Sequence, residues 1–170
     1  MSSAQENHTE QSPGLQSDLD LLHEIFLFRG LDYDCMKLLA LLAKRVQYIA
    51  GDRLMVEGEE DDNCYLLVSG AIGVCYHSNE QKVELKDYGA GDFFGGGSLL
   101  SRMTRLYTLE AKTGAVVLVI SREQFQKVVH QYPNSLERVV KNYFSELTRW
   151  DRIHVEALGK EKTVSGVSLL

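Results

Sequence analysis

The decisive stretch of the chain reads Phe93-Phe94-Gly95-Gly96-Gly97-Ser98-Leu99-Leu100 and is closed by Arg105. Three consecutive glycines suit neither a strand nor a helix interior, but they let a ligand approach the backbone closely. Successive N–H groups in such a loop can form a nest for an anion, and a helical turn beginning near Ser98 would direct its positive end there. Arg105 can grip two phosphate oxygens at once. The stretch therefore predicts a phosphate pocket built from Gly95, Gly96, Gly97, Ser98 and Arg105.

A second interpretation of these residues is a tight turn beside a solvated arginine. The loop lacks the lysine and hydroxyl of a P-loop and does not open a long helix. An arginine directed into a β-barrel without a counter-ion would be a costly buried charge. We therefore expect Arg105 to meet an anion, to lie beside an acidic residue such as Glu110 or Asp92, or to be exposed.

The residues around this stretch predict a mainly β fold with flanking helices. From Arg45 to Ser121 short apolar runs are divided by glycines and acidic turns, which is typical of a barrel or jelly roll. Val83 and Leu85 alternate with charged residues and are expected to face inward. The predicted organisation is a disordered tail (1–16), one domain (17–158) and a flexible tail (159–170). Within the domain we expect a helical lead-in at 17–44, the β-barrel at 45–121 and C-terminal helices at 122–158.

The helical segments have their own signals. Ser17 or Asp18 can cap the first helix, and a helix is predicted over Arg122 to Gln131. A longer helix is predicted from Asn134 to Leu158. Its apolar residues step by four and three, as in a heptad seam, through Leu136, Val140, Tyr143, Leu147 and Trp150 to a point near His154. Three interpretations of this stripe stay open: a seam for a partner helix, a lid over the pocket, or packing against the barrel.

Beyond the residues themselves, the glycine stretch resembles the phosphate-binding cassette of cyclic-nucleotide-binding domains, the barrels of catabolite activators and protein kinase A regulatory subunits. The resemblance extends from Leu21 to Leu158. Further matching segments are Tyr48 to Asp52, Val56 to Gly70, Gly91 to Gly95 and Thr104-Arg105. It implies a jelly roll with N-terminal helices before it and two C-terminal helices after it.

The resemblance also implies how a ligand would be held. Gly95 to Ser98 would donate N–H groups to a cyclic phosphate, with Arg105 neutralising its charge. The base and ribose would meet Val83, Leu85, Leu106 and Tyr107, while Tyr143, Leu147 and Trp150 would form a lid or a dimer seam. Tyr107 stands where small residues are usual, so its ring either stacks on a ligand or fills the space.

Two positions bear on which ligand is expected. The family cassette carries a glutamate that accepts a hydrogen bond from the ribose 2′-hydroxyl, and Gly96 replaces it here. Leaving that hydroxyl unpaired costs about 1–3 kcal/mol, or about 5- to 150-fold in affinity. Leu106 lacks the hydroxyl that accompanies a preference for guanine in the family, so cAMP is expected rather than cGMP.

Composition limits the remaining classes. A formal charge of −6 argues against a general nucleic-acid binder. Three scattered cysteines, no signal peptide and no membrane-spanning run predict a cytoplasmic protein without membrane attachment. About a dozen residues follow the long helix, too few for a DNA-reading helix pair. The five histidines are dispersed, so we expect no catalytic group, no metal and no cofactor.

The combined prediction is a stand-alone regulatory module, not an enzyme, that binds cAMP and relays occupancy through its C-terminal helix. The alternative is a degenerate barrel that binds no ligand. Such a barrel would serve as a scaffold, docking an unknown protein partner or forming a homodimer through Asn134 to Leu158.

Overall fold

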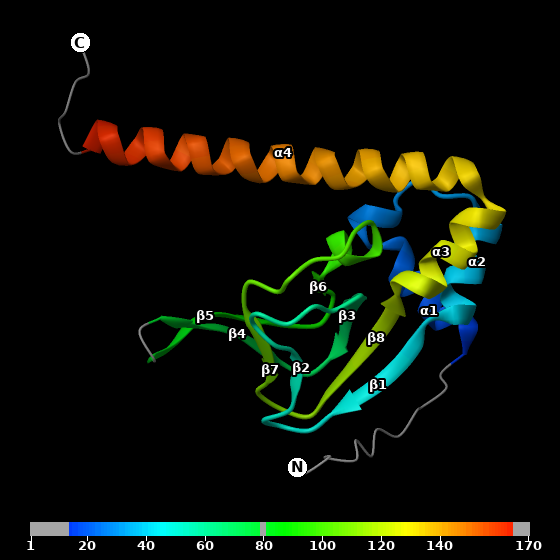
Figure 1. The fold of residues 1–170 in the computed structure, drawn as a ribbon, viewed down its shortest axis with the longest axis horizontal. Helices are drawn as coiled ribbons and strands as arrows, with labels where there is room; N and C mark the ends of the chain where they lie inside the picture. The colour runs from blue at the N-terminus through cyan, green and yellow to red at the C-terminus, as the bar shows by residue number, and fades with distance from the viewer. Residues whose placement is uncertain (1–13, 79–80, 165–170) are drawn as a thin grey trace.

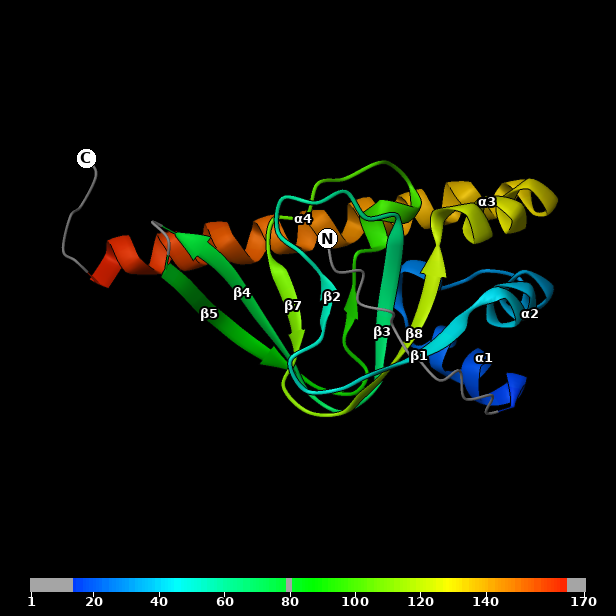
Figure 2. The same cartoon turned by 60° about the horizontal axis from the view of Figure 1, so that its bottom comes forward.

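The computed structural model describes residues 14–78 and 81–164 and shows two facing β-sheets with a helical cluster at one end (Figure 1). The first sheet has the order β1 (Lys44–Tyr48), β8 (Ala115–Ser121), β3 (Asn63–Ser69), β6 (Phe93–Phe94). The second has the order β2 (Arg53–Met55), β7 (Thr108–Ala111), β4 (Ile72–Ser78), β5 (Gln81–Tyr88). All pairings are antiparallel (Figure 2). The mainly β jelly-roll prediction is confirmed, as two packed sheets and not as one closed barrel.

The two inner strands of the first sheet, β8 and β3, are buried on both faces. Alternate residues of β8 point to opposite sides, so Val117 joins the core between the sheets while Leu118 and Ile120 join a second core beneath the helices. Burial on two sides explains why this strand reads as a continuous apolar run. Phe94 of β6 pairs with Tyr65 of β3, which brings the start of the glycine stretch onto the edge of this sheet.

A bulge in the second sheet overturns one expectation. Val74 of β4 pairs with Lys86, but the next residue, Cys75, pairs with Glu84, so Leu85 is an extra residue in β5. An extra residue breaks the alternation of side chains along a strand. Leu85 is 55% exposed, so the prediction that it faces inward is wrong. Val83 is half-buried.

The N-terminal helices are α1 (Leu15–His23), η1 (Phe26–Phe28) and α2 (Tyr33–Leu42). Neither Ser17 nor Asp18 caps α1, because Gly14 holds that position. Asp18 instead forms a buried ion pair with Arg45 of β1 at 2.7 Å, which ties the first helix to the sheet. The helical lead-in therefore begins near the predicted place but is anchored differently. Residues 1–13 of the expected N-terminal tail lie outside the described residues.

Helix α3 (Arg122–Gln131) has the predicted bounds. It begins with a capping box in which the Ser121 hydroxyl accepts from the Gln124 N–H and the Gln124 side chain accepts from the Ser121 N–H. Phe125, Val128 and Val129 are buried in the core beneath the helices. The capping box and this apolar face account for where α3 starts and which side it buries.

Helix α4 (Pro133–Val164) is longer than predicted and packs mainly on η1 and α3. Val139 is fully buried, whereas Phe144, Trp150 and Ile153 are each more than half exposed. Its later turns extend away from the helical cluster along the side of the sheets (Figures 1 and 2). The side chain of His154 and residues 165–170 lie outside the described part of the chain.

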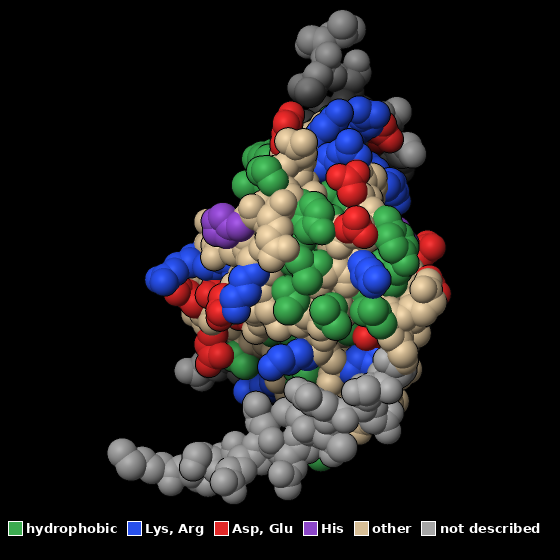
Figure 3. Space-filling model, turned by 90° about the vertical axis from the view of Figure 1, so that its right-hand side faces the viewer, with side chains coloured by type: hydrophobic (Ala, Val, Ile, Leu, Met, Phe, Trp, Pro, Cys, Tyr) green, Lys and Arg blue, Asp and Glu red, His purple; other side chains and the backbone are tan. Residues whose placement is uncertain are grey.

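The helical end of the molecule also exposes apolar side chains, seen as green patches in Figure 3. A shallow hollow of about 260 Å³ there is lined by residues of α1, α2 and the end of α3, including Leu15, Leu38, Leu41 and Tyr132. Leu41 is 65% exposed. Among the described helices none has the length and apolarity needed to cross a bilayer.

Candidate ligand-binding site

The glycine stretch forms a left-handed turn followed by one short helical turn. Gly95 has φ +74°, a conformation that side chains disfavour, and it precedes η2 (Gly96–Leu99). A Cβ at Gly95 would lie 2.9 and 3.0 Å from the two terminal nitrogens of Arg105. The absence of a side chain at Gly95 thus allows the Arg105 guanidinium to pack directly against the loop. Gly95 and Arg105, which the sequence analysis assigned to one pocket, are therefore neighbours.

The next two glycines are crowded by other side chains of the same molecule. A Cβ at Gly96 would come within 2.9 Å of the Phe93 ring and 3.1 Å of a Leu27 methyl group. A Cβ at Gly97 would come within 2.5 Å of the Tyr143 hydroxyl. Close internal packing is therefore one physical reason for glycine at both positions.

Arg105 is buried and already has an acidic partner. Its Nη2 lies 3.0 Å from Asp61 Oδ2 and donates to the Asn63 carbonyl at 2.6 Å. Asp61 also accepts from the Tyr65 hydroxyl at 2.7 Å and from the Asn63 backbone and side-chain nitrogens. Of the three expectations for Arg105, a neighbouring carboxylate is the one observed. The named partners were wrong: Glu110 pairs with Lys82, and Asp92 accepts from the Gly89 N–H.

Two buried polar atoms beside the loop have no hydrogen-bond partner among the described residues. They are Ser98 Oγ and Arg105 Nε. Buried polar groups are nearly always paired, so an unpaired hydroxyl and an unpaired guanidinium N–H near one glycine loop leave hydrogen-bonding capacity that a further polar group can use once the loop or the guanidinium shifts. This is the local feature that most favours an anion site.

Arg122 holds the far end of the loop, a role that sequence reasoning missed. Its Nε donates to the Ser98 carbonyl at 2.6 Å, and its Nη2 donates to the Ser101 carbonyl at 3.1 Å and pairs with Asp62. These contacts join residues more than 20 positions apart, so no local pattern predicts them. Arg122 thereby fastens η2 to the start of α3.

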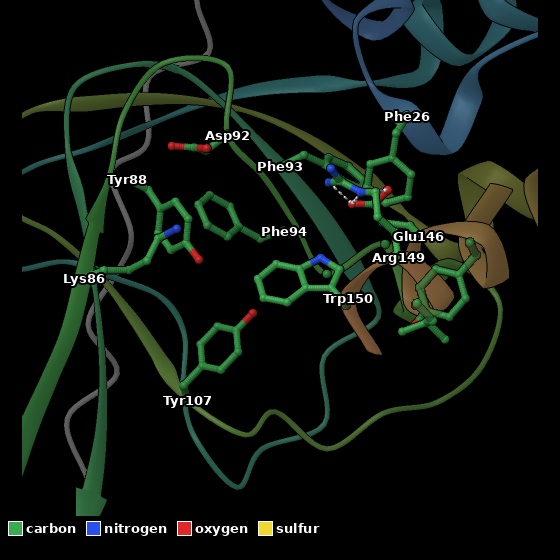
Figure 4. Close-up of a pocket in the computed structure, with 15 residues that line it drawn as sticks. Phe26, Lys86, Tyr88, Asp92, Phe93, Phe94, Tyr107, Glu146, Arg149 and Trp150 are labelled. Atoms are coloured by element: carbon green, nitrogen blue, oxygen red, sulfur yellow. Dashed lines mark hydrogen bonds and ion pairs between the residues drawn. The ribbon is translucent and has the colours of Figure 1, made fainter. Parts of the chain in front are cut away.

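A pocket of about 390 Å³ lies beside Gly95, Gly96 and Gly97, within the size range of small-molecule sites. Seven of its lining residues are aromatic: Phe26, Tyr88, Phe93, Phe94, Tyr107, Tyr143 and Trp150. Figure 4 shows Tyr88, Phe94, Tyr107 and Trp150 arranged around one hollow. Lys86 Nζ lies 3.8 Å from the centre of the Tyr88 ring, which places an ammonium group in the same wall.

The third, fourth and fifth turns of α4 cover this pocket. Tyr143, Leu147 and Trp150 all line it, together with Glu146 and Arg149, which pair with each other. Leu147 is 43% and Trp150 54% exposed, so the covering helix leaves the pocket open to solvent. Tyr143, Leu147 and Trp150 therefore lie beside the pocket, and a movement of α4 as a lid stays a prediction. The main contacts of α4 are with η1 and α3, and Val139 joins the core that also contains Leu66 and Leu118 of the first sheet.

Several residues predicted for the base and ribose wall lie elsewhere. Val83, Leu85 and Leu106 do not line the pocket, and Leu106 is 79% exposed. The Leu85 bulge explains one case. Residues 106 and 107 form a bend before β7, so strand alternation does not apply to them. Tyr107 does line the pocket, whereas Arg105 and Ser98 lie behind the loop, outside the lining.

Burial and neighbouring charges set the ionisation of two tyrosines. Burial raises the pKa of Tyr107, and the nearby Tyr88 raises it further, while Arg105 opposes the change. Burial also raises the pKa of Tyr65, and its hydrogen bond to Asp61 adds to that effect. Both phenols are therefore neutral at neutral pH, and Tyr107 presents a hydroxyl group to the pocket while the Tyr65 hydroxyl is donated to Asp61.

Comparison with known proteins identifies the family. The family model described as the cyclic nucleotide-binding domain matches residues 45–132, more than half of the chain. The chain belongs to the cyclic nucleotide-binding domain family. It is 30% identical over 110 residues to the cAMP-dependent protein kinase regulatory subunit of Candida albicans, covering 65% of this chain and 23% of that subunit. The chain thus spans about a quarter of that relative.

Solved structures of the cyclic nucleotide-binding domain family have the same fold. A cyclic nucleotide-binding-like protein from Brucella abortus is 30% identical, with a TM-score of 0.64 over 67% of this chain and 98% of that one. A cyclic nucleotide-binding domain from Methylobacillus flagellatus is 18% identical, with a TM-score of 0.73 over 100% of this chain and 96% of that one. The second likeness bears on the fold alone.

Proposed function

We propose that this chain is a regulatory module that binds a cyclic nucleotide, cAMP rather than cGMP, and relays occupancy through α4. The observation that carries the proposal is the pair of unpartnered polar atoms, Ser98 Oγ and Arg105 Nε, buried beside a glycine loop and a 390 Å³ pocket. Family membership and the 30% identical kinase regulatory subunit support it. No catalytic step is part of the proposal.

The phosphate would sit on the loop. The first N–H groups of a helical turn lack partners within that turn, so Gly96 and Gly97 can donate to an anion. Arg105 would neutralise the phosphate charge from beside Gly95, since its terminal nitrogens pack closely against that residue. Because Arg105 is held by Asp61 and lies outside the pocket lining, binding requires a shift of the guanidinium or of the loop. A ligand that binds the shifted state better draws the population toward it.

The signal would pass to α4 at Gly97. The Tyr143 hydroxyl lies over Gly97, so an anion bound at the loop N–H groups competes with that contact. The same helix is fastened to η1 by Asn142, whose side-chain nitrogen donates to the carbonyls of Leu27 and Arg29 at 3.1 and 2.9 Å. A displaced Tyr143 would therefore alter how α4 is held. The preference for cAMP over cGMP rests on the family resemblance alone, in which a hydroxyl at position 106 accompanies guanine, because Leu106 itself is 79% exposed and does not line the pocket.

Isothermal titration calorimetry with cAMP and cGMP tests the proposal. We expect wild-type protein to bind cAMP more tightly than cGMP, and Arg105→Gln to weaken cAMP binding at least tenfold. Arg102→Ala is the matched control, because Arg102 is exposed and close in the chain. No heat from either nucleotide at millimolar concentration would overturn the proposed function.

A second candidate function is a scaffold that forms a homodimer or docks a protein through residues 134–158. The observation that favours it is a pair of exposed apolar residues three positions apart on α4, Trp150 at 54% and Ile153 at 51% exposure. Light scattering of wild type and Ile153→Asp tests it, because Ile153 does not line the pocket. A wild-type monomer at high protein concentration would count against a homodimer.

A further inference from the structure

Met103 packs against the glycine loop without lining the pocket. A Cβ at Gly97 would come within 2.6 Å of the Met103 sulfur and within 2.5 Å of the Tyr143 hydroxyl. Both atoms therefore lie beside the same backbone position. Gly97 and Tyr143 line the pocket, whereas Met103 does not. The thioether thus sits where the loop meets α4, outside the space that a ligand would fill.

The segment that carries Met103 is anchored on both sides. Before it, the Ser101 carbonyl accepts from Arg122 Nη2 at 3.1 Å. After it, Thr104 forms an isolated β-bridge with Glu60. These anchors limit how far the Met103 sulfur can move from the glycine loop.

Met103 is also the exposed methionine among the residues that the structure describes. It is 38% exposed, whereas Met36 and Met55 are buried at 0% and 4%. Of these three thioethers, an oxidant in solution reaches that of Met103 first. Oxidation makes methionine polar, so its effect on the neighbouring groups is large.

We propose that Met103 is an oxidation site that controls anion binding at the glycine loop. A peroxide transfers one oxygen atom to the thioether and leaves as water or an alcohol, so the sulfur loses two electrons and the peroxide gains them. The sulfoxide oxygen accepts hydrogen bonds far better than a thioether sulfur, which is a weak acceptor. Beside Gly97, it takes the Tyr143 hydroxyl or the loop N–H as its donor and so occupies the groups that meet an incoming anion. The inference rests on the proposed function and adds regulation to it.

Titration of the wild-type chain with cAMP before and after treatment with hydrogen peroxide tests the inference, with peptide mass spectrometry to locate the added oxygen. We expect Met103 to be oxidised before Met36 and Met55. We expect cAMP affinity to fall by about tenfold, the order of one hydrogen bond, and to recover after treatment with methionine sulfoxide reductases. Unchanged affinity in protein fully oxidised at Met103 would overturn the inference, as would equally fast oxidation of the two buried methionines.

A pair of variants assigns the effect to the sulfur. Met103→Leu keeps the apolar volume and every other methionine, so its cAMP affinity should not respond to peroxide. Met103→Gln supplies a permanent carbonyl acceptor at this position and should bind cAMP about as weakly as the oxidised wild type. A response to peroxide in Met103→Leu as large as in the wild type would overturn the assignment.

Trp150 gives a readout that needs no nucleotide. It is the one tryptophan of the chain, it lies on α4, and Figure 4 shows it beside the hollow. A sulfoxide that bonds to Tyr143 changes how α4 meets the loop, so peroxide should shift Trp150 emission in the wild type and not in Met103→Leu. Identical emission shifts in the two proteins, or none in either, would overturn the sulfoxide contact. An emission shift without cAMP binding by either form would instead overturn the proposed function.

Discussion

Replacing Asp61 with alanine removes the carboxylate that holds Arg105. The ion pair joins Arg105 Nη2 to Asp61 Oδ2 at 3.0 Å, and the two side chains are 6% and 13% exposed. Removing one partner of a buried pair costs about 3–5 kcal/mol, because the other charge is left uncompensated. We therefore expect Asp61→Ala to lower the free energy of unfolding by about that amount, a large part of the total for a domain.

Urea denaturation followed by circular dichroism measures this loss. Asp62→Ala is the matched control: Asp62 pairs with Arg122 but is 56% exposed, so its contribution should stay below about 1 kcal/mol. Equal losses in the two variants would refute the reasoning that the Arg105 pair is a buried one.

The same Asp61 variant makes a second measurement informative. An arginine released from its carboxylate can turn to a ligand phosphate, which then supplies the missing counter-charge. A tenfold gain in affinity corresponds to about 1.4 kcal/mol, less than half of the expected loss of stability. We expect Asp61→Ala to bind cAMP about tenfold more tightly than wild type in calorimetry. Weaker binding would show that Asp61 positions Arg105 for the ligand and does not compete with it.

Three further predictions concern single features. Ser121→Ala should cost about 1 kcal/mol in urea denaturation because it removes the hydroxyl of the capping box with Gln124, and Ser121→Asp should retain most of the stability. Gly97→Ala should lower the free energy of unfolding by about 1–3 kcal/mol, because the added methyl group overpacks against the Tyr143 hydroxyl. In a Tyr143→Phe background that hydroxyl is gone, so the same substitution should cost less. Purely additive losses would contradict this. Burial raises the pKa of Cys64 to about 12, so a thiol reagent at pH 8 should leave Cys64 unmodified until denaturant is added. The neutral thiol is favoured in the folded state, so its contribution to the free energy of unfolding should be lost only as the pH rises above about 9.

Local sequence patterns predicted the elements whose signals lie within a few residues. Helix α3 has the predicted bounds because its capping residues and apolar spacing are neighbours in the chain. The β region from Arg45 to Ser121 was expected from its short apolar runs, and the turn at Gly95 from the glycines themselves. For these elements, short-range propensity and the tertiary structure agree.

Other features depend on contacts that no local pattern carries. Asp61 lies 44 positions from Arg105, and several carboxylates were equally plausible partners until the chain was folded. The extra residue at Leu85 became visible only through the pairing of β4 with β5. Lys86 and Tyr88 were overlooked as pocket residues because their place beside the glycine loop depends on how distant segments pack together.

Arg122 has a mechanical consequence for the molecule. One guanidinium group bonds to carbonyls at both ends of the segment from Ser98 to Ser101, and its own backbone is the first turn of α3. Because these bonds join the segment to the first turn of α3, a movement of one must either move the other or break the bonds. A displacement of the loop would therefore reach α4 by two routes. One route runs through Arg122 and α3, and the other runs through Tyr143.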